Sequence, residues 1–334
     1  MQHPRLGAAV FATLVVAGGA IVSCRAERAD RAAGAAPAVR SEMLVTTAWL
    51  QEHVGDSNVV VVHVARDRSV FDTAHVPGAR FLSWNDVATT RDGLPNELPR
   101  LEQLVATIRR LGIDSMSRVI LYSEDPGLIA ARAYVAFDYA GIGDSTALLD
   151  GGWRVWTAEH RTVTADTSVV RPTAYAPHFD PDALIMRRVV RDVVWSRDAC
   201  GDLRFALVDA RPRAQYIGTE PGEHITRSGH IPGAVNIPWL QDVESEDHPV
   251  LRSPDELRAR LRALNVPPVG ATIVTYCRTG GQASHTYFTL RYLGYDVRLY
   301  DGSYIDWSAD STLPVIGPKD TIEISNKRKA SCQA

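Results

Sequence analysis

Short apolar runs and segments of helical periodicity alternate along most of this chain. The apolar runs predict buried strands at Val59–Val64, Val119–Tyr122, Phe205–Asp209 and Ile273–Tyr276. Apolar residues at helical spacing predict helices between them, for example Leu101–Leu111 and Pro254–Leu264, the second with Ser253 as its N-cap. This alternation predicts α/β domains, each with a mostly parallel sheet flanked by helices.

The whole pattern occurs twice. Ala74-His-Val-Pro-Gly-Ala79 reappears as Gly229-His-Ile-Pro-Gly-Ala234, and Asp150-Gly-Gly-Trp153 reappears as Asp301-Gly-Ser-Tyr304. The separation between the copies stays nearly constant, which indicates a duplication. We therefore expect two tandem domains over residues 44–160 and 185–316, a proline-containing linker over 161–184 and a polar tail over 317–334.

Composition sets the broad class of protein. With 334 residues, 45% of them hydrophobic and 22% charged, the chain has room for two soluble domains with their own cores. The net charge of -3 and the lack of a long basic run argue against a nucleic-acid partner.

The N-terminus differs from the rest of the chain. Arg5 precedes the apolar stretch Leu6–Val22, and this pattern predicts a signal peptide over residues 1–23. The ending Ile21-Val-Ser-Cys24 resembles a bacterial lipobox, which implies a lipidated Cys24 followed by a tether over 24–43. We expect an exported protein on the periplasmic side, anchored in the outer membrane rather than the inner one because Arg25 follows the cysteine. A plain signal peptide or an uncleaved anchor is the alternative.

The most informative segment is Cys277-Arg-Thr-Gly-Gly-Gln282, called here the cysteine loop. It lies between a predicted strand and a helix over 283–293, so the positive helix end and its backbone N–H groups favour a thiolate. The paired glycines let the backbone approach an anion, and Arg278 adds a cation. These features predict a nucleophile, whereas a lone cysteine after a strand is more commonly a small buried hydrophobe. Cys200 is interpreted as structural, and Cys332 lies in the polar tail.

At this point the chain resembles the two-domain rhodanese family of sulfurtransferases, thiosulfate sulfurtransferases in particular, over about residues 44–316. The cysteine loop is similar to the family's six-residue active-site loop. Val208-Asp-Ala-Arg211, Gly229–Ala234 and Gly294–Trp307 match three further family signatures in the right order. The resemblance implies two rhodanese-like domains with the active centre in the second.

The resemblance also implies a mechanism. A Cys277 thiolate would take the sulfane sulfur of a small-molecule donor as a persulfide and pass it to cyanide or a thiol, with no metal or organic cofactor. The expected contacts to the donor are Arg278, Thr279, Gly280, Gly281, Gln282, Arg211 and Arg213, with Asp209 and His230 as structural support. We expect a monomer that meets the membrane only through its lipid.

The donor stays open. Arg278 directly after the cysteine favours thiosulfate, because relatives with a basic residue there tend to use that dianion. Gln282 and Gln215 stand where many relatives have other residues, so 3-mercaptopyruvate is an alternative donor, and a non-enzymatic persulfide carrier is a third possibility. A phosphatase of related fold would need Arg at the position of Ala283, so the sequence argues against that class of enzyme.

Several residues have a structural alternative. Asp209 and Arg211 either brace the loop or bind substrate, and His285 is either catalytic or exposed. His230 recurs in the first half as His75, and Asp301-Gly302 also recurs, so we interpret both as elements of the fold.

The first half provides an internal comparison. Ser123 replaces Cys277, and Glu124–Gly127 replaces Arg278–Gly281. We call Ser123–Gly127 the serine loop. The two acids would repel an anion and Pro126 has no N–H to donate, so we expect the first half to be inactive and to form the other wall of a cleft over Cys277.

Overall fold

The computed structural model describes residues 36–176, 178–195, 205–266 and 270–318. Cys24, Cys200 and Cys332, together with the predicted signal peptide, lie outside these residues. Among the described residues, no helix combines the length and apolar character needed to cross a membrane.

The first domain contains a five-stranded sheet in which all neighbouring strands are parallel. Across the sheet the strands are β1 (Leu44–Val45), β7 (Thr146–Leu149), β6 (Arg118–Tyr122), β2 (Val59–Ala65) and β3 (Arg80–Ser83). Its helices are α2 (Thr47–His53), α3 (Ser69–Thr73), α4 (Leu101–Arg110), α5 (Leu128–Tyr139) and α6 (Gly152–Ala158). A separate antiparallel hairpin consists of β4 (Thr89–Arg91) and β5 (Leu94–Glu97).

The second domain repeats this plan with a four-stranded parallel sheet. Its strands, in order, are β11 (Val297–Leu299), β10 (Thr272–Tyr276), β8 (Phe205–Asp209) and β9 (Val235–Asn236). Its helices are α7 (Arg187–Trp195), α8 (Arg213–Ile217), α9 (Pro254–Ala263), α10 (Gly281–Tyr292) and α11 (Ser303–Ala309). An isolated bridge between Leu184 and Leu299 stands where the first domain has β1.

Short 3-10 helices join these elements: η1 (Ser41–Met43), η2 (Trp84–Asp86), η3 (Gly143–Ser145), η4 (Pro181–Ala183) and η5 (Trp239–Asp242). The predicted α/β class with parallel sheets is confirmed, and the strands and helices named from the sequence lie within two residues of their expected ends. Ser253 caps α9 as predicted, because its side chain accepts from the Glu256 N–H while the Glu256 carboxylate accepts from the Ser253 N–H.

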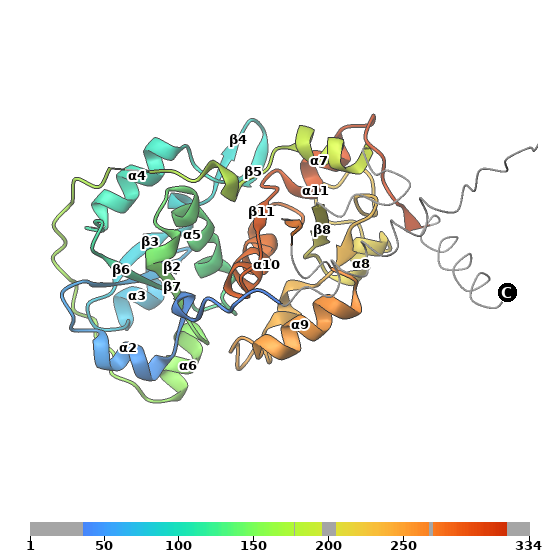
Figure 1. The fold of residues 1–334 in the computed structure, drawn as a ribbon. Coiled ribbons are helices and arrows are strands. Elements are labelled where there is room, and N and C mark those ends of the chain that lie inside the picture. The colour runs from blue at the N-terminus through green and yellow to red at the C-terminus, as the bar shows by residue number, and fades with distance from the viewer. Residues whose placement is uncertain (1–35, 177, 196–204, 267–269, 319–334) are drawn as a thin grey trace, which may run out of the picture.

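Helices α5 and α10 lie side by side between the two sheets (Figure 1). Residues 130–138 of α5 and 283–290 of α10 are all buried, as expected for helices covered on every side. Tyr134 and Phe288 pack edge to face with ring centroids 5.0 Å apart, and the Tyr287 hydroxyl donates to Asp138 at 2.6 Å. One hydrophobic cluster therefore runs through both domains and fixes their relative position.

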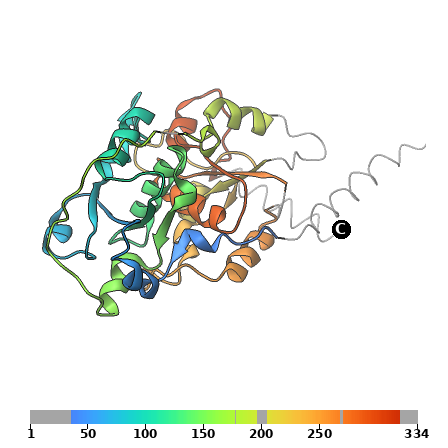
Figure 2. The same cartoon turned by 60° about the vertical axis from the view of Figure 1, so that its left-hand side comes forward.

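The N-terminal segment also joins the domains. Residues 36–40 pass along the second domain before the chain enters the first (Figure 2). The Arg40 N–H donates to the Tyr292 carbonyl at 2.8 Å, and Arg258 donates to the Pro37 carbonyl. The end of α10 and the middle of α9 are thus tied to the segment that leads into the first domain.

Candidate active site

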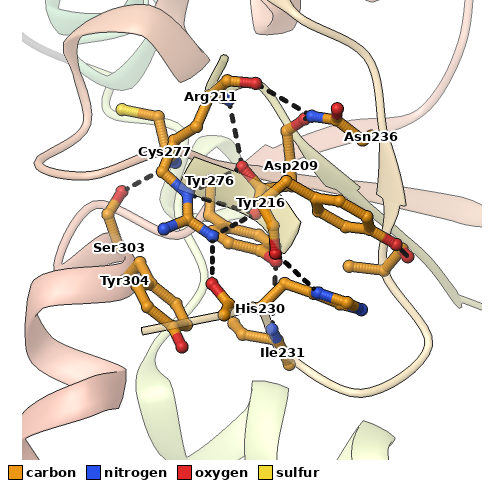
Figure 3. Close-up of polar contacts among 12 residues, drawn as sticks. Asp209, Arg211, Tyr216, His230, Ile231, Asn236, Tyr276, Cys277, Ser303 and Tyr304 are labelled. Atoms are coloured by element: carbon orange, nitrogen blue, oxygen red, sulfur yellow. Dashed lines mark hydrogen bonds and ion pairs between the residues drawn. The ribbon is translucent and has the colours of Figure 1, made fainter. Parts of the chain in front are cut away.

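Cys277 follows β10 directly, and its side chain is buried, with only 1% of the residue exposed. Its N–H donates to Ser303 Oγ at 3.3 Å, and its carbonyl accepts from the Tyr304 N–H at 2.9 Å (Figure 3). The first two residues of α11 therefore hold both backbone polar groups of the cysteine. This is the position at the carboxyl end of a parallel strand where α/β folds bind ligands.

The cysteine loop presents backbone donors at the N-terminus of α10. Gly280 is the N-cap, with φ +90° and ψ -32°, a conformation that glycine tolerates and other residues do not. Among the hydrogen bonds within the described ranges, none is donated by the backbone N–H groups of residues 278–282. These groups, together with the positive end of the helix dipole, can stabilise an anion next to the cysteine.

The other loop side chains differ in their surroundings. Arg278 is partly exposed and pairs with Glu223, its Nη1 lying 3.1 Å from a carboxylate oxygen and 3.2 Å from the backbone carbonyl. Thr279 is buried, and its Oγ1 accepts from Asn96 Nδ2 of the first domain at 3.0 Å. Gln282 is partly exposed, and Arg213 is exposed on α8.

Asp209 and Arg211 form a buried ion pair beneath the loop. The guanidinium binds both carboxylate oxygens, donates to the Gly229 carbonyl at 2.7 Å and lies 4.0 Å over the Tyr304 ring. Burial alone would lower the pKa of Arg211, but the Asp209 carboxylate outweighs it and raises that pKa above its ordinary value. Figure 3 shows this guanidinium among Asp209, Tyr276 and Tyr304, with the Cys277 sulfur directed away from it. The geometry supports the bracing role of Arg211 over contact with substrate.

His230 and His75 play matching parts in the two domains. His230 Nδ1 lies 2.8 Å from the Tyr216 carbonyl and its ring stacks on Tyr216, while His75 Nδ1 lies 2.6 Å from the Phe71 carbonyl and its ring stacks on Phe71. The repetition in a domain without the cysteine supports a structural role for both.

Of the two alternatives left open for His285, exposure to solvent is excluded, because only 3% of the residue is accessible. It packs against Trp239, and an added Cβ on Gly127 of the serine loop would lie 3.6 Å from its ring. Burial lowers the pKa of His285 to about 4, so the ring is neutral near pH 7. Its Nδ1 lies 3.9 Å from an oxygen of Asp242, whose pKa burial raises to about 7.

The serine loop binds a carboxylate of its own at the N-terminus of α5. Ser123 Oγ donates to Asp125 Oδ1 at 2.5 Å, and the Ile129 N–H donates to Asp125 Oδ2 at 3.1 Å. Burial raises the pKa of Asp125, and these donors oppose that shift. An acid of the chain therefore occupies the helix end that the cysteine loop leaves for an external anion.

One pairing between the halves requires correction. The sequence pairs Gly127 with Gly281, but the N-cap glycines with φ +90° are Gly127 and Gly280. The serine loop is therefore one residue longer than the cysteine loop, counted from Ser123 or Cys277 to the N-cap glycine.

The first domain contributes residues that the sequence reasoning missed. An added Cβ on Gly281 would lie 3.6 Å from Leu128 and 3.7 Å from Trp84, so these two side chains line the cysteine loop. Arg132, the only charge within the apolar stretch Leu128–Phe137, reaches the same region from α5. An isolated charge in an apolar helix indicates a buried polar contact, so the sequence could have pointed to Arg132. The sequence around Trp84 has no comparable pattern.

Comparison with known proteins supports one family. Residues 46–159 and 192–310 both match the family model of the rhodanese-like domain. A sulfur carrier protein of Thermus thermophilus is 34% identical over 284 residues, which make up 82% of this chain and 96% of that protein. A thiosulfate sulfurtransferase of Corynebacterium glutamicum is 32% identical over 287 residues, or 82% of this chain and 90% of that one.

A solved structure agrees with these relatives. SseA from Escherichia coli, described as a 3-mercaptopyruvate sulfotransferase with the rhodanese fold, has a TM-score of 0.66 and 25% identity, covering 78% of this chain and 98% of that chain. The matched segments include both strand-loop-helix units, the one with Cys277 and the one with Ser123. The chain therefore belongs to the rhodanese family of sulfurtransferases, with two rhodanese-like domains in tandem.

Proposed function

We propose that this protein transfers the sulfane sulfur of thiosulfate to a thiophilic acceptor, cyanide or a thiol, through a persulfide on Cys277. The observation that carries the proposal is the pairing of a buried cysteine with backbone N–H groups that bind no acceptor within the described residues. The serine loop lacks both features, since it has a hydroxyl in place of the thiol and its own carboxylate at the helix end.

The reaction proceeds in two displacements. The Cys277 thiolate attacks the outer sulfur of thiosulfate, a new S–S bond forms to the cysteine, and sulfite leaves with the electron pair of the old bond. The acceptor then attacks the terminal sulfur of the persulfide and regenerates the thiolate. The N–H groups of residues 278–282 stabilise the negative charge on the thiolate and on the persulfide in turn.

Arg278 provides the cation for the donor. It is the loop's only charged side chain and is partly exposed, so it can exchange Glu223 for a thiosulfate oxygen. The Corynebacterium glutamicum relative named thiosulfate sulfurtransferase supports this donor.

Two of the similar proteins support alternative functions within the same family. The 3-mercaptopyruvate sulfotransferase structure keeps the keto-acid donor as the second candidate. The relative named as a sulfur carrier protein keeps a carrier role, in which the persulfide passes to a protein partner rather than to a small acceptor.

The deciding experiment incubates the purified protein with each donor and measures the mass of the peptide that contains Cys277. We expect a gain of one sulfur with thiosulfate and thiocyanate formation when cyanide is added. Cys277→Ser abolishes both, and the matched control Ser123→Ala retains both. A wild-type protein that is never persulfidated refutes the sulfurtransferase proposal, and persulfidation without turnover to cyanide or thiols favours the carrier.

We also propose that the protein is exported, on the basis of the sequence that precedes the described residues. The apolar stretch Leu6–Val22 followed by Cys24 fits a lipoprotein signal, which would place the enzyme on the periplasmic side as a lipid-anchored monomer. Metabolic labelling with a radioactive fatty acid, compared between wild type and Cys24→Ala, tests the anchor, and an unlabelled wild-type protein refutes it.

A further inference from the structure

Each domain holds the Asp-Gly turn of the other through a short strap. Residues 96–98 form the first strap, in which the Leu98 N–H donates to Asp301 Oδ2 at 2.6 Å. Residues 249–251 form the second strap, in which the Leu251 N–H donates to Asp150 Oδ1 at 2.9 Å. Asp150 and Asp301 are copies of one position in the repeat, so the two contacts are equivalent in the two halves.

The two contacts differ in one charged residue. Arg132 on α5 is fully buried and donates to Asp301 Oδ1 at 2.7 Å and to the Asn96 carbonyl. His285 occupies the equivalent place on α10, since each follows its N-cap glycine, Gly127 or Gly280, at the same spacing. The contact next to the cysteine loop therefore contains a guanidinium, whereas on the side of the serine loop the neutral imidazole of His285 only lines a small cavity with Asp150 and Leu251.

This guanidinium lies against the turn of the cysteine loop. A Cβ added to Gly280 would be 2.9 Å from Asp301 Oδ1 and 3.1 Å from Arg132 Nη1, so the ion pair packs directly on the N-cap of α10. Gly280 is the residue whose positive φ turns the loop into the helix. The pair is thus in a position to fix that turn.

Asn96 holds the preceding residue of the loop. Its Nδ2 donates to Thr279 Oγ1 at 3.0 Å, while its backbone, at φ +63°, presents the carbonyl to Arg132. The equivalent place in the second strap is Pro249, which has no side-chain donor. Of the two straps, only residues 96–98 provide a side-chain donor to the loop that they cover.

We infer that Arg132 and Asn96 are positioning residues through which the first domain sets the geometry of the cysteine loop. The two contacts fix Thr279 and Gly280 from outside the second domain, and this keeps the N–H groups of residues 278–282 directed toward the cysteine sulfur. A buried ion pair is costly to desolvate and contributes little net stability, so its presence in only one of two mirror contacts is explained by what it positions. The first domain thus acts on the reaction, although it has lost its own thiol.

The test rests on the proposed function but includes a readout independent of it. Arg132→Gln and Asn96→Ala are compared with wild type and with the mirror control Asp150→Asn, measuring Tm, kcat and KM with thiosulfate and cyanide, and the rate of Cys277 alkylation by iodoacetamide against pH. We expect kcat to fall about 10- to 100-fold in the first two variants, since small misplacements of reacting groups have effects of this size. We also expect their alkylation curves to move to higher pH, and Asp150→Asn to keep both wild-type values.

A double variant keeps the test decisive if Arg132→Gln leaves the Asp301 charge unpaired and fails to fold. In Arg132→Gln/Asp301→Asn no buried charge lacks a partner, and we expect the loss of kcat to persist. Variants that lower Tm but retain wild-type kcat and alkylation curves overturn the inference. If wild type shows no turnover with any donor, the proposed function fails, and the alkylation curves still decide whether the loop is positioned by Arg132 and Asn96.

Discussion

At the scale of single residues, Asp125 in the serine loop and Cys277 in the cysteine loop show two uses of the equivalent helix end in the two domains. Both follow the carboxyl end of a central strand, next to the N-terminus of a buried helix. Asp125 fills its helix end with a carboxylate bound by Ser123 and Ile129, so an external anion has no place there. At the helix end next to Cys277, the N–H groups of residues 278–282 bind no acceptor within the described residues and can bind an external anion. The expected inactivity of the first half therefore has a physical cause beyond the missing sulfur.

Glu223 is expected to compete with the donor for Arg278. The pair is 3.1 Å apart but exposed on the Glu223 side, so it is weak and exchangeable. Glu223→Gln should lower KM for thiosulfate by about two- to fivefold and leave kcat nearly unchanged. Steady-state kinetics at low and high salt measure this effect, which shrinks as salt screens the charges.

The control for this prediction is Glu220→Gln, an exposed acid on the same segment. An equal change of KM in both variants would show that the effect comes from net charge alone. A KM that is unchanged or raised in Glu223→Gln would show that the carboxylate does not compete with the donor.

At the scale of elements, the junction between the cysteine loop and α10 depends on the backbone of one glycine. Gly280 has φ +90°, and an added Cβ would meet Asp301 at 2.9 Å, whereas a Cβ on the adjacent Gly281 meets nothing closer than 3.6 Å. The two glycines are adjacent, but only Gly280 combines a positive φ with a close contact for an added Cβ. This makes them a matched pair for mutation.

Gly280→Ala should lower the free energy of unfolding by roughly 1–2 kcal/mol or more, since a side chain is strained at positive φ. It should also reduce kcat strongly, because the loop N–H groups shift with the turn. Gly281→Ala should change the free energy of unfolding much less, because its added Cβ makes only ordinary contacts. Chemical denaturation and steady-state rates measure these changes, and equal effects of the two substitutions would contradict the role given to Gly280.

At the scale of the whole molecule, the two domains are joined by a core that contains buried acids. Burial raises the pKa of Asp242 to about 7, against the opposing effect of Arg260, and raises the pKa of Asp150 to about 6. His285 beside Asp242 stays neutral over this range because burial lowers its pKa to about 4. The interior near α10 therefore favours the protonated form of these carboxyl groups.

The sign of the resulting pH dependence follows from linkage. An unfolded aspartate has a pKa near 3.9, so between about pH 4 and 7 the folded protein binds the Asp242 proton and the unfolded chain does not. Stability from this group is therefore lost as pH rises through that window. Asp242→Asn should retain more of its Tm between pH 5 and 8 than wild type does. Calorimetry across this range checks it, with Asp255→Asn, an exposed position on α9, as the control, and parallel Tm curves would refute it.

The sequence by itself determined the repeat, the α/β class, the N-cap at Ser253 and the cysteine loop, because each of these depends on short-range patterns of polarity, glycine and capping residues. It also indicated that only Cys277 has the thiol and its loop, since the serine loop provided the comparison within one chain. Local sequence could not determine that His285 is buried or that the serine loop is one residue longer.

Only the tertiary structure decided how the first domain meets the cysteine loop. Arg132 and Asn96 are distant in sequence from Thr279 and Asp301, and they come together only because α5 packs on α10 and the first strap crosses between the domains. Packing within the second domain decides that Arg211 is braced by Asp209 and Tyr304 rather than facing the cysteine sulfur. Burial and long-range contacts depend on the whole chain, so no local pattern contains them.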